Sequence, residues 1–183
     1  MSKLYYTDEA EMLAHKAWET LQLSPPVDLY RVAESLGLDI CEKEFDDSID
    51  GIYVRLPEGL ARIGLNNLYT KPMSRRRFTL AHEIGHHLLS RKVNPGKNLF
   101  FVDGSKTGST LMEKACNRFA VLLLMPEMLI KEHHEQLARN PENRLAILSD
   151  RFGVSNWAMR RRLKEIGLQP TGYTGRKARN WTD

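Results

Sequence analysis

Cysteine is scarce in this sequence of 183 residues, which contains only Cys41 and Cys116. Small secreted domains held together by disulfides have many more cysteines, so both thiols are expected to be reduced. No apolar run approaches the ~20 residues of a membrane span. Residues 1–7 also lack the apolar core of a secretory signal peptide. These absences predict a cytoplasmic protein with no membrane segment.

Net charge is also small, +4 at neutral pH, but it is unevenly distributed. Residues 150–183 contain eight Lys or Arg against three Asp or Glu, so the rest of the chain is close to neutral. A basic end can bind nucleic acid or an acidic partner. A solvated tail is the alternative, and it is favoured for the last dozen residues. The length and a hydrophobic fraction of 42% fit one packed domain with a small appendage.

The most informative stretch is residues 77–89, where a His-Glu-x-x-His motif lies between apolar residues that predict a buried helix. On a helix, His82 and His86 lie one turn apart and can bind a single metal ion. Glu83 lies beside them, where it can accept a proton from water. A catalytic zinc ion uses such a carboxylate because it lowers the pKa of its water to about 7. His87 points off the ligand face and is expected either at the rim or in the layer behind the metal ligands.

A catalytic zinc site needs a third protein ligand, and the best candidate is Glu113 in a second predicted helix. Asn117 follows one turn later and can accept a hydrogen bond from His82. Two alternatives remain open. Thr110 and Glu113 have the spacing of a capping box, in which Glu113 only closes the start of its helix. Cys116 is a soft metal ligand, although its angular position on the helix differs from that of Glu113.

Three segments together resemble the ImmA/IrrE family of metallopeptidases: Phe-Thr-Leu-Ala-His-Glu-Ile-Gly-His-His-Leu-Leu, then Glu-x-x-x-Asn-x-Phe-Ala, then Leu-Leu-Met-Pro. The resemblance covers roughly residues 25–130. It implies a zincin-like, gluzincin-type peptidase with one catalytic Zn²⁺ ion on His82, His86 and Glu113, and with Glu83 as the catalytic base. It also implies a partner: a helix-turn-helix repressor of the phage-repressor type, whose cleavage or inactivation would de-repress a mobile-element or stress-response operon.

Residues 38–68 have the alternating pattern of β-strands. We expect strands near residues 38–45, 52–56 and 61–65, in a three-stranded antiparallel sheet packed on the helix of the motif. The fold class is therefore α+β. An exposed edge of such a sheet can bind an extended peptide. Residues 91–109 are predicted to be a long loop bordering the cleft, with residues 100–102 as a lid, a substrate wall or an anchor.

Residues 145–168 predict two helices separated by Gly153 and Val154, with Ser155 capping the second. This pattern resembles a helix-turn-helix. Its second helix carries three candidate nucleic-acid contacts, Arg160, Arg161 and Arg162. A unit that supports the peptidase or docks the repressor is favoured over DNA binding. The predicted organisation is a peptidase domain at 1–138, a helix-turn-helix-like unit at 139–168 and a basic flexible tail at 169–183.

Two functions follow from these features. The first function is that of a zinc endopeptidase. Tyr53, Tyr69 and the histidines late in the sequence are candidates for stabilising the oxyanion, and the sequence does not rank them. The alternative is a non-catalytic regulator that binds DNA or a repressor and contains a structural metal. Glu83 discriminates between them, because a structural metal site has no use for a general base.

Overall fold

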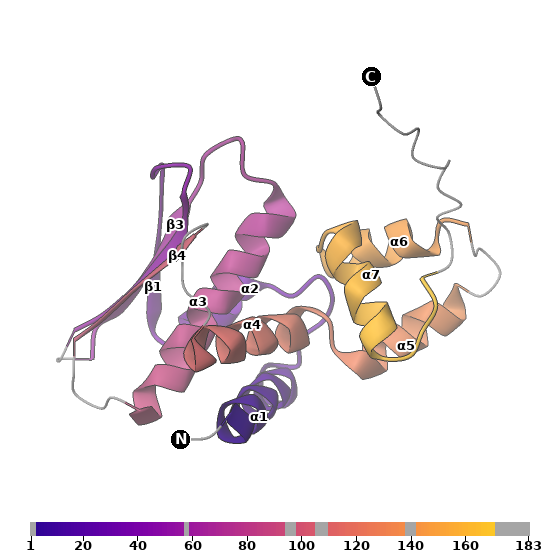
Figure 1. Cartoon of the computed structure of the whole chain (residues 1–183), viewed down its shortest axis with the longest axis horizontal. Helices are drawn as coiled ribbons and strands as arrows, with labels where there is room; N and C mark the ends of the chain where they lie inside the picture. Colours follow the sequence, from indigo (N-terminus) through magenta and orange to yellow (C-terminus); the bar gives the residue numbers. More distant parts are fainter. Residues whose placement is uncertain (1–2, 57–58, 94–97, 105–109, 138–141, 171–183) are drawn as a thin grey trace.

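The structure is a computed structural model that describes residues 3–56, 59–93, 98–104, 110–137 and 142–170. The predicted tail lies outside this part from residue 171 onward. The described chain is a mixture of helices and strands, and Figure 1 shows their arrangement. The order is α1 (Lys3–Leu21), α2 (Leu29–Ser35), β1 (Leu38–Lys43), β2 (Ile49–Arg55), β3 (Ala61–Asn66), α3 (Met73–Val93), β4 (Leu99–Gly104), α4 (Leu111–Leu124), α5 (Glu127–Gln136), α6 (Arg144–Phe152) and α7 (Asn156–Glu165).

The described sheet has four strands in the order β1-β3-β2-β4. β2 pairs antiparallel with β3 and with β4, whereas β1 runs parallel to β3. The α+β class is confirmed, but the three-stranded antiparallel sheet is wrong in strand number and in the direction of β1. Alternation marks which residues face the core and does not reveal which strand pairs with which. The fourth strand lies within the predicted loop at 91–109, where Gly, Asn and Lys on both sides obscure a short apolar run.

Helix α3 lies between the sheet and α4, and α1 packs on α4 (Figure 1). The core forms on both sides of α3: Leu80 and Ile84 are buried with Ile63 of the sheet and Phe119 of α4. Gly85 allows α3 and α4 to approach closely, since a Cβ atom there would lie 3.2 Å from the Cα of Cys116. This close approach is what brings the start of α4 against the histidines of α3.

The start of α3 is anchored by arginine side chains. The helix begins at Met73, directly after Pro72. Arg75 and Lys71 pair with Asp50 of β2. Burial alone would raise the pKa of Asp50, but these two cations outweigh it and lower the pKa. Arg77 donates to the carbonyl of Val27 at 2.8 Å and to that of Gly153 at 3.1 Å.

Helices α5, α6 and α7 lie together at one end of the molecule (Figure 1). The predicted turn is confirmed in its caps: Gly153 is left-handed with φ of 64°, and the Ser155 hydroxyl accepts a hydrogen bond from the Ala158 N–H. Arg162 joins α7 to the end of α4, because its Nε donates to the Met125 carbonyl at 3.1 Å. The assignment of α6 and α7 as a helix-turn-helix unit stays a prediction. No helix among the described residues is both long and apolar enough to cross a membrane.

Candidate metal centre

Three polar side chains from two helices converge beneath the sheet. The Nε2 atoms of His82 and His86 on α3 are 3.0 Å apart. Glu113, in the first turn of α4, places Oε2 3.1 Å from His82 Nε2 and Oε1 3.3 Å from His86 Nε2. Both imidazoles are 1% exposed. The structure therefore brings together the three side chains that the sequence predicts as metal ligands.

The surroundings of His82 and Glu113 orient both groups. Asn117 Oδ1 lies 3.0 Å from His82 Nδ1, so the amide oxygen accepts the Nδ1 proton and leaves a lone pair on Nε2. The Thr110 hydroxyl accepts a hydrogen bond from the Glu113 N–H at 3.2 Å. Capping and ligation therefore do not compete at Glu113: its backbone is capped by Thr110 while its carboxylate faces the histidines.

The protonation states suit a divalent cation. Burial would raise the pKa of Glu113, but hydrogen bonds with His82 and His86 outweigh it and lower the pKa to about 2. Burial lowers the pKa of His86, although Glu113 opposes this effect. An ionised carboxylate beside a neutral imidazole is the state in which such groups bind metals.

Cys116 belongs to a second donor set. Its Sγ and one ring nitrogen each of His82 and His86 all lie within 4.8 Å of one another. The angular argument from the sequence excluded this approach, but it took no account of how closely α4 packs on α3 at Gly85. Burial, followed by the nearby carboxylates, raises the pKa of Cys116 well above its ordinary value. The neutral thiol makes Glu113 the better donor to a cation.

Asp103 is a site residue that the sequence did not single out. Its carboxylate lies within 4.8 Å of donor atoms of both His82 and Glu113. Asp103 comes from β4, so it could not be placed while that segment was interpreted as a loop. Phe101 of the same strand stacks on the His86 ring, with centroids 4.3 Å apart and planes inclined by 19°. β4 therefore forms one wall of the site.

Glu83 is fully buried, and neither carboxylate oxygen has a hydrogen-bond partner among the described residues. Burial raises its pKa well above the ordinary value, and the charges of Asp103 and Glu113 add to the effect. A buried carboxylate without a partner is costly. A cation with a bound water next to His82 and His86 would satisfy it, so the residues present fit a metal ion.

Gly51 of β2 provides the space for the Glu83 side chain. A Cβ atom at this position would lie 2.6 Å from Glu83 Oε1 and 2.6 Å from Thr79 Cγ2. These distances are shorter than van der Waals contact, so no larger residue fits without moving Glu83. The role of Gly51 follows from the packing of β2 on α3, and nothing in the sequence pattern indicates it.

Of the two positions expected for His87, the rim is wrong, because this side chain is 4% exposed. Its Nδ1 is 3.0 Å from the hydroxyl of Tyr53, which is fully buried. Burial, with Arg91 and Arg55 adding to it, lowers the pKa of His87 to about 4. The hydroxyl of Tyr53 is thus engaged with His87, whereas Tyr69 is 92% exposed.

The remaining candidates lie on the C-terminal helices. Arg162 is 3% exposed and is held by the Met125 carbonyl, so its guanidinium is engaged inside the protein. Arg161 is exposed, and Arg160 is partly exposed. The late histidines accept hydrogen bonds from arginines: His133 from Arg151 at 2.8 Å and His134 from Arg144 at 3.0 Å.

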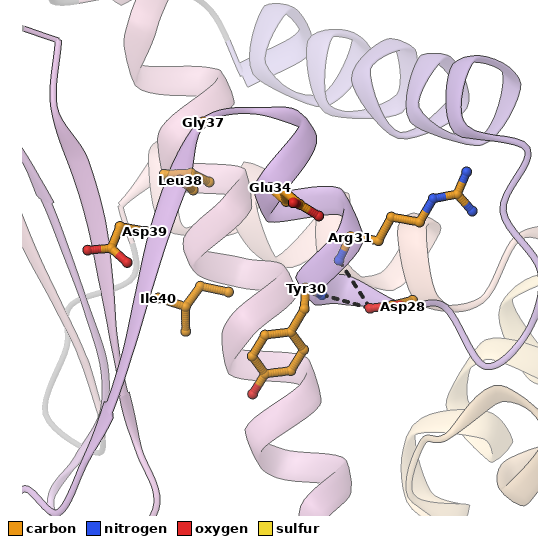
Figure 2. A pocket seen from close by; sticks show the side chains of 8 residues that line it. All are labelled: Asp28, Tyr30, Arg31, Glu34, Gly37, Leu38, Asp39 and Ile40. Atoms are coloured by element: carbon orange, nitrogen blue, oxygen red, sulfur yellow. Dashed lines mark hydrogen bonds between the residues drawn. The ribbon is translucent and has the colours of Figure 1, made fainter.

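A depression of about 660 Å³ lies between α2 and β1 (Figure 2). Its lining includes Asp28, Glu34 and Asp39 but none of the convergent histidines. The Asp28 carboxylate caps α2 by accepting hydrogen bonds from the N–H groups of Tyr30 and Arg31, both at 3.1 Å (Figure 2). This carboxylate therefore stabilises the start of α2. The residues that line the depression do not form a catalytic arrangement.

Comparison with protein families gives one match. Residues 33–164 match the model of a peptidase family, M78, described as the IrrE N-terminal-like domain. The matched segment contains both histidines of the motif, Glu83 and Glu113. No curated protein matches the chain.

Proposed function

This chain belongs to the M78 peptidase family of the IrrE N-terminal-like domain, and from this premise we propose that it is a zinc-dependent endopeptidase. His82, His86 and Glu113 hold the metal ion, and Glu83 is the catalytic base. The division into a peptidase domain and a helix-turn-helix-like unit is part of the same proposal.

The main support is the convergence of two imidazole nitrogens and one carboxylate within 3.3 Å, next to a buried carboxylate that has no partner among the described residues. Two imidazoles and a carboxylate are a donor set that suits zinc and leaves one coordination position for water or substrate. A structural zinc site is closed by four protein ligands and needs no base. The catalytic interpretation therefore explains Glu83, and the alternative of a structural metal does not.

Zinc bound at such a site supplies Lewis acidity and lowers the pKa of a water ligand to about 7. Asn117 orients the His82 ring through Nδ1, and Phe101 packs on the His86 ring. Glu83 accepts a proton from the attacking water and passes it to the amine of the leaving group. Burial raises the pKa of Glu83 and so makes its carboxylate a stronger base, while a cation nearby favours the ionised form that can accept the proton.

The substrate approaches along β4. This strand is one edge of the described sheet, and it carries Phe101 and Asp103 against the site. An extended peptide can pair with such an edge through main-chain hydrogen bonds. We propose that the peptide belongs to a helix-turn-helix repressor, as the ImmA/IrrE resemblance implies.

The decisive experiment is zinc-dependent proteolysis. The zinc-loaded protein is incubated with a proteome-derived peptide pool and, separately, with the repressor encoded nearest to it, and the products are identified by mass spectrometry. We expect defined internal cuts that cease on treatment with a chelator and return with zinc but not with magnesium, which prefers oxygen ligands. Cutting that continues in protein shown to be metal-free would contradict the proposal, as would an uncut pool with zinc bound.

Gly51 gives a test that depends on the packing around Glu83. In Gly51→Ala, the new methyl group collides with Glu83 Oε1 and Thr79 Cγ2, so we expect at least about tenfold lower kcat/KM. Overpacking should also lower the free energy of unfolding by about 1–3 kcal/mol. The matched control is Gly64→Ala in β3, whose methyl group would lie 3.2 Å from the end of the Phe45 ring and 3.7 Å from Ile52 Cβ, away from Glu83. Equal activity in the two variants would disprove the role of Gly51.

A further inference from the structure

A groove of about 800 Å³ lies between the start of α3, one face of α4 and α7. We call it the Trp157 groove, and its characteristic residues are Phe78, Lys114, Val121, Trp157, Ala158 and Arg161. Asn117 also lines it, while its Oδ1 lies 3.0 Å from His82 Nδ1. The groove therefore borders the residue that orients the His82 ring, and its volume suits several side chains of a bound chain.

The lining of the groove contains more cations than acids. Five cationic residues line it and only one acid does. Arg75 and Arg118 are paired with acids, but Lys114 and Arg161 have no acidic partner in the described part of the chain. Both of these side chains are exposed. Two cations without partners on opposite walls, one on α4 and one on α7, are complementary to carboxylates rather than to lysines.

The groove also has an apolar surface. Trp157 is 68% exposed, and Arg161 lies over its ring at 5.5 Å from the centroid. Phe78, Val121 and Ala158 are half-buried along the same groove. An exposed tryptophan next to arginine is the residue pair most often found at the energetic centre of protein interfaces. The occupant should therefore combine apolar side chains with acidic ones.

Nucleic acid is the less suitable occupant. Binding to a phosphate backbone requires a row of free cations. Here Arg162 is buried, and Arg75 and Arg118 are neutralised by Asp50, Glu11 and Glu165. The contact of Asn117, which lines the groove, with His82 also favours the molecule that is cut at the metal centre.

We propose that the Trp157 groove binds an acidic, apolar segment of the protein substrate beside the scissile bond. This inference rests on the proposed peptidase function. It gives α7 a role as part of the substrate-binding surface, and it makes acidic residues near the cut a determinant of specificity.

The test measures binding separately from cutting. Two labelled peptides of about 12 residues, about 40 Å when extended, share the same Leu and Phe positions and differ in having Glu or Lys between them. Fluorescence anisotropy is recorded with the zinc-loaded, full-length Glu83→Gln protein. We expect the acidic peptide to bind at least about tenfold more tightly than the basic one. Trp157→Ala and the double variant Lys114→Glu/Arg161→Glu should each weaken its binding by at least about tenfold, and Trp157→Phe by less.

Matched controls use exposed residues outside the groove. Met128→Ala removes an apolar side chain that is 83% exposed, and Lys16→Glu/Arg31→Glu reverses two exposed cations. Both should bind the acidic peptide as the parent does. Unchanged binding in Trp157→Ala and in the double reversal would overturn the inference. Equal binding of the basic peptide, or Trp157-dependent binding of a single-stranded RNA instead, would also overturn it.

The two proposals fail in different ways. An uncut peptide pool with the zinc-loaded wild type contradicts the peptidase function, whatever the anisotropy shows. In a pool that is cut, Lys114→Glu/Arg161→Glu should lose the preference for acidic residues beside the cut while other sites are still cleaved. A pool cut with the same preference by both proteins contradicts the role of the groove alone.

Discussion

Replacing Glu83 by glutamine should lower kcat/KM by about 10²–10⁴-fold, because the variant keeps the shape of the side chain but loses the general base. Zinc should be retained, since the metal is held by His82, His86 and Glu113. The measurement pairs cleavage of the peptide pool with the zinc content of the purified protein. Glu34→Gln is the matched control, because this glutamate is exposed on α2. A Glu83→Gln protein that cuts at the wild-type rate would rule out the mechanism.

Glu83→Gln also distinguishes loss of the catalytic base from loss of folding stability. Burial raises the pKa of Glu83 above the ordinary 4.5, so the metal-free folded protein keeps a proton that the unfolded chain releases. The contribution of Glu83 to the stability of the metal-free wild type should therefore fall as the pH rises above about 4.5, and the comparison with Glu83→Gln isolates this contribution from those of the neighbouring histidines. Glutamine does not titrate, so Glu83→Gln should be at least as stable as the wild type at pH 7 in the presence of a chelator. Thermal unfolding at several pH values measures this difference.

Much of the site could be predicted because it depends on local geometry. The one-turn spacing of His82 and His86 fixes their alignment on any helix. The same periodicity places Asn117 one turn after Glu113, and the 3.0 Å contact between Asn117 and His82 matches that expectation. These relations depend only on helix formation, for which the apolar pattern of residues 77–89 is a strong signal.

The residues that were missed depend on contacts between distant segments. Asp103 joins the site only because β4 pairs with β2, and strand pairing is not encoded in a local pattern. The same pairing decides among the roles expected for residues 100–102, because it packs Phe101 on the His86 ring. Gly51 matters because β2 crosses α3 next to Glu83. The choice between the two positions expected for His87 also depended on the sheet, which covers that face of α3 through Tyr53. Periodicity identified the face but not the element that packs on it.

Glutamine at position 113 should weaken zinc binding by at least about 100-fold, since even a lost contact to a ligand costs 10–100-fold. The change removes the negative charge of the carboxylate next to His82 and His86 but keeps the hydrogen bond of the Glu113 N–H with Thr110. Competition with a fluorescent chelator measures the affinity, and cleavage of the peptide pool should decline in parallel.

Both candidate donor sets contain His82 and His86, and they differ in the third donor, which is Glu113 in one and Cys116 in the other. Cys116→Ala is the control that distinguishes them. Glu113 already contacts both imidazole nitrogens within 3.3 Å and is ionised, whereas burial keeps Cys116 as a neutral thiol. We therefore expect Cys116→Ala to keep its zinc and its activity. Loss of zinc from Cys116→Ala, with retention by Glu113→Gln, would assign the metal to the thiolate and leave Glu113 as a neighbouring acid. Loss from Glu113→Gln alone makes Glu113 the third ligand and leaves Glu83, which is fully buried and has no hydrogen-bond partner among the described residues, as the carboxylate for the role of base.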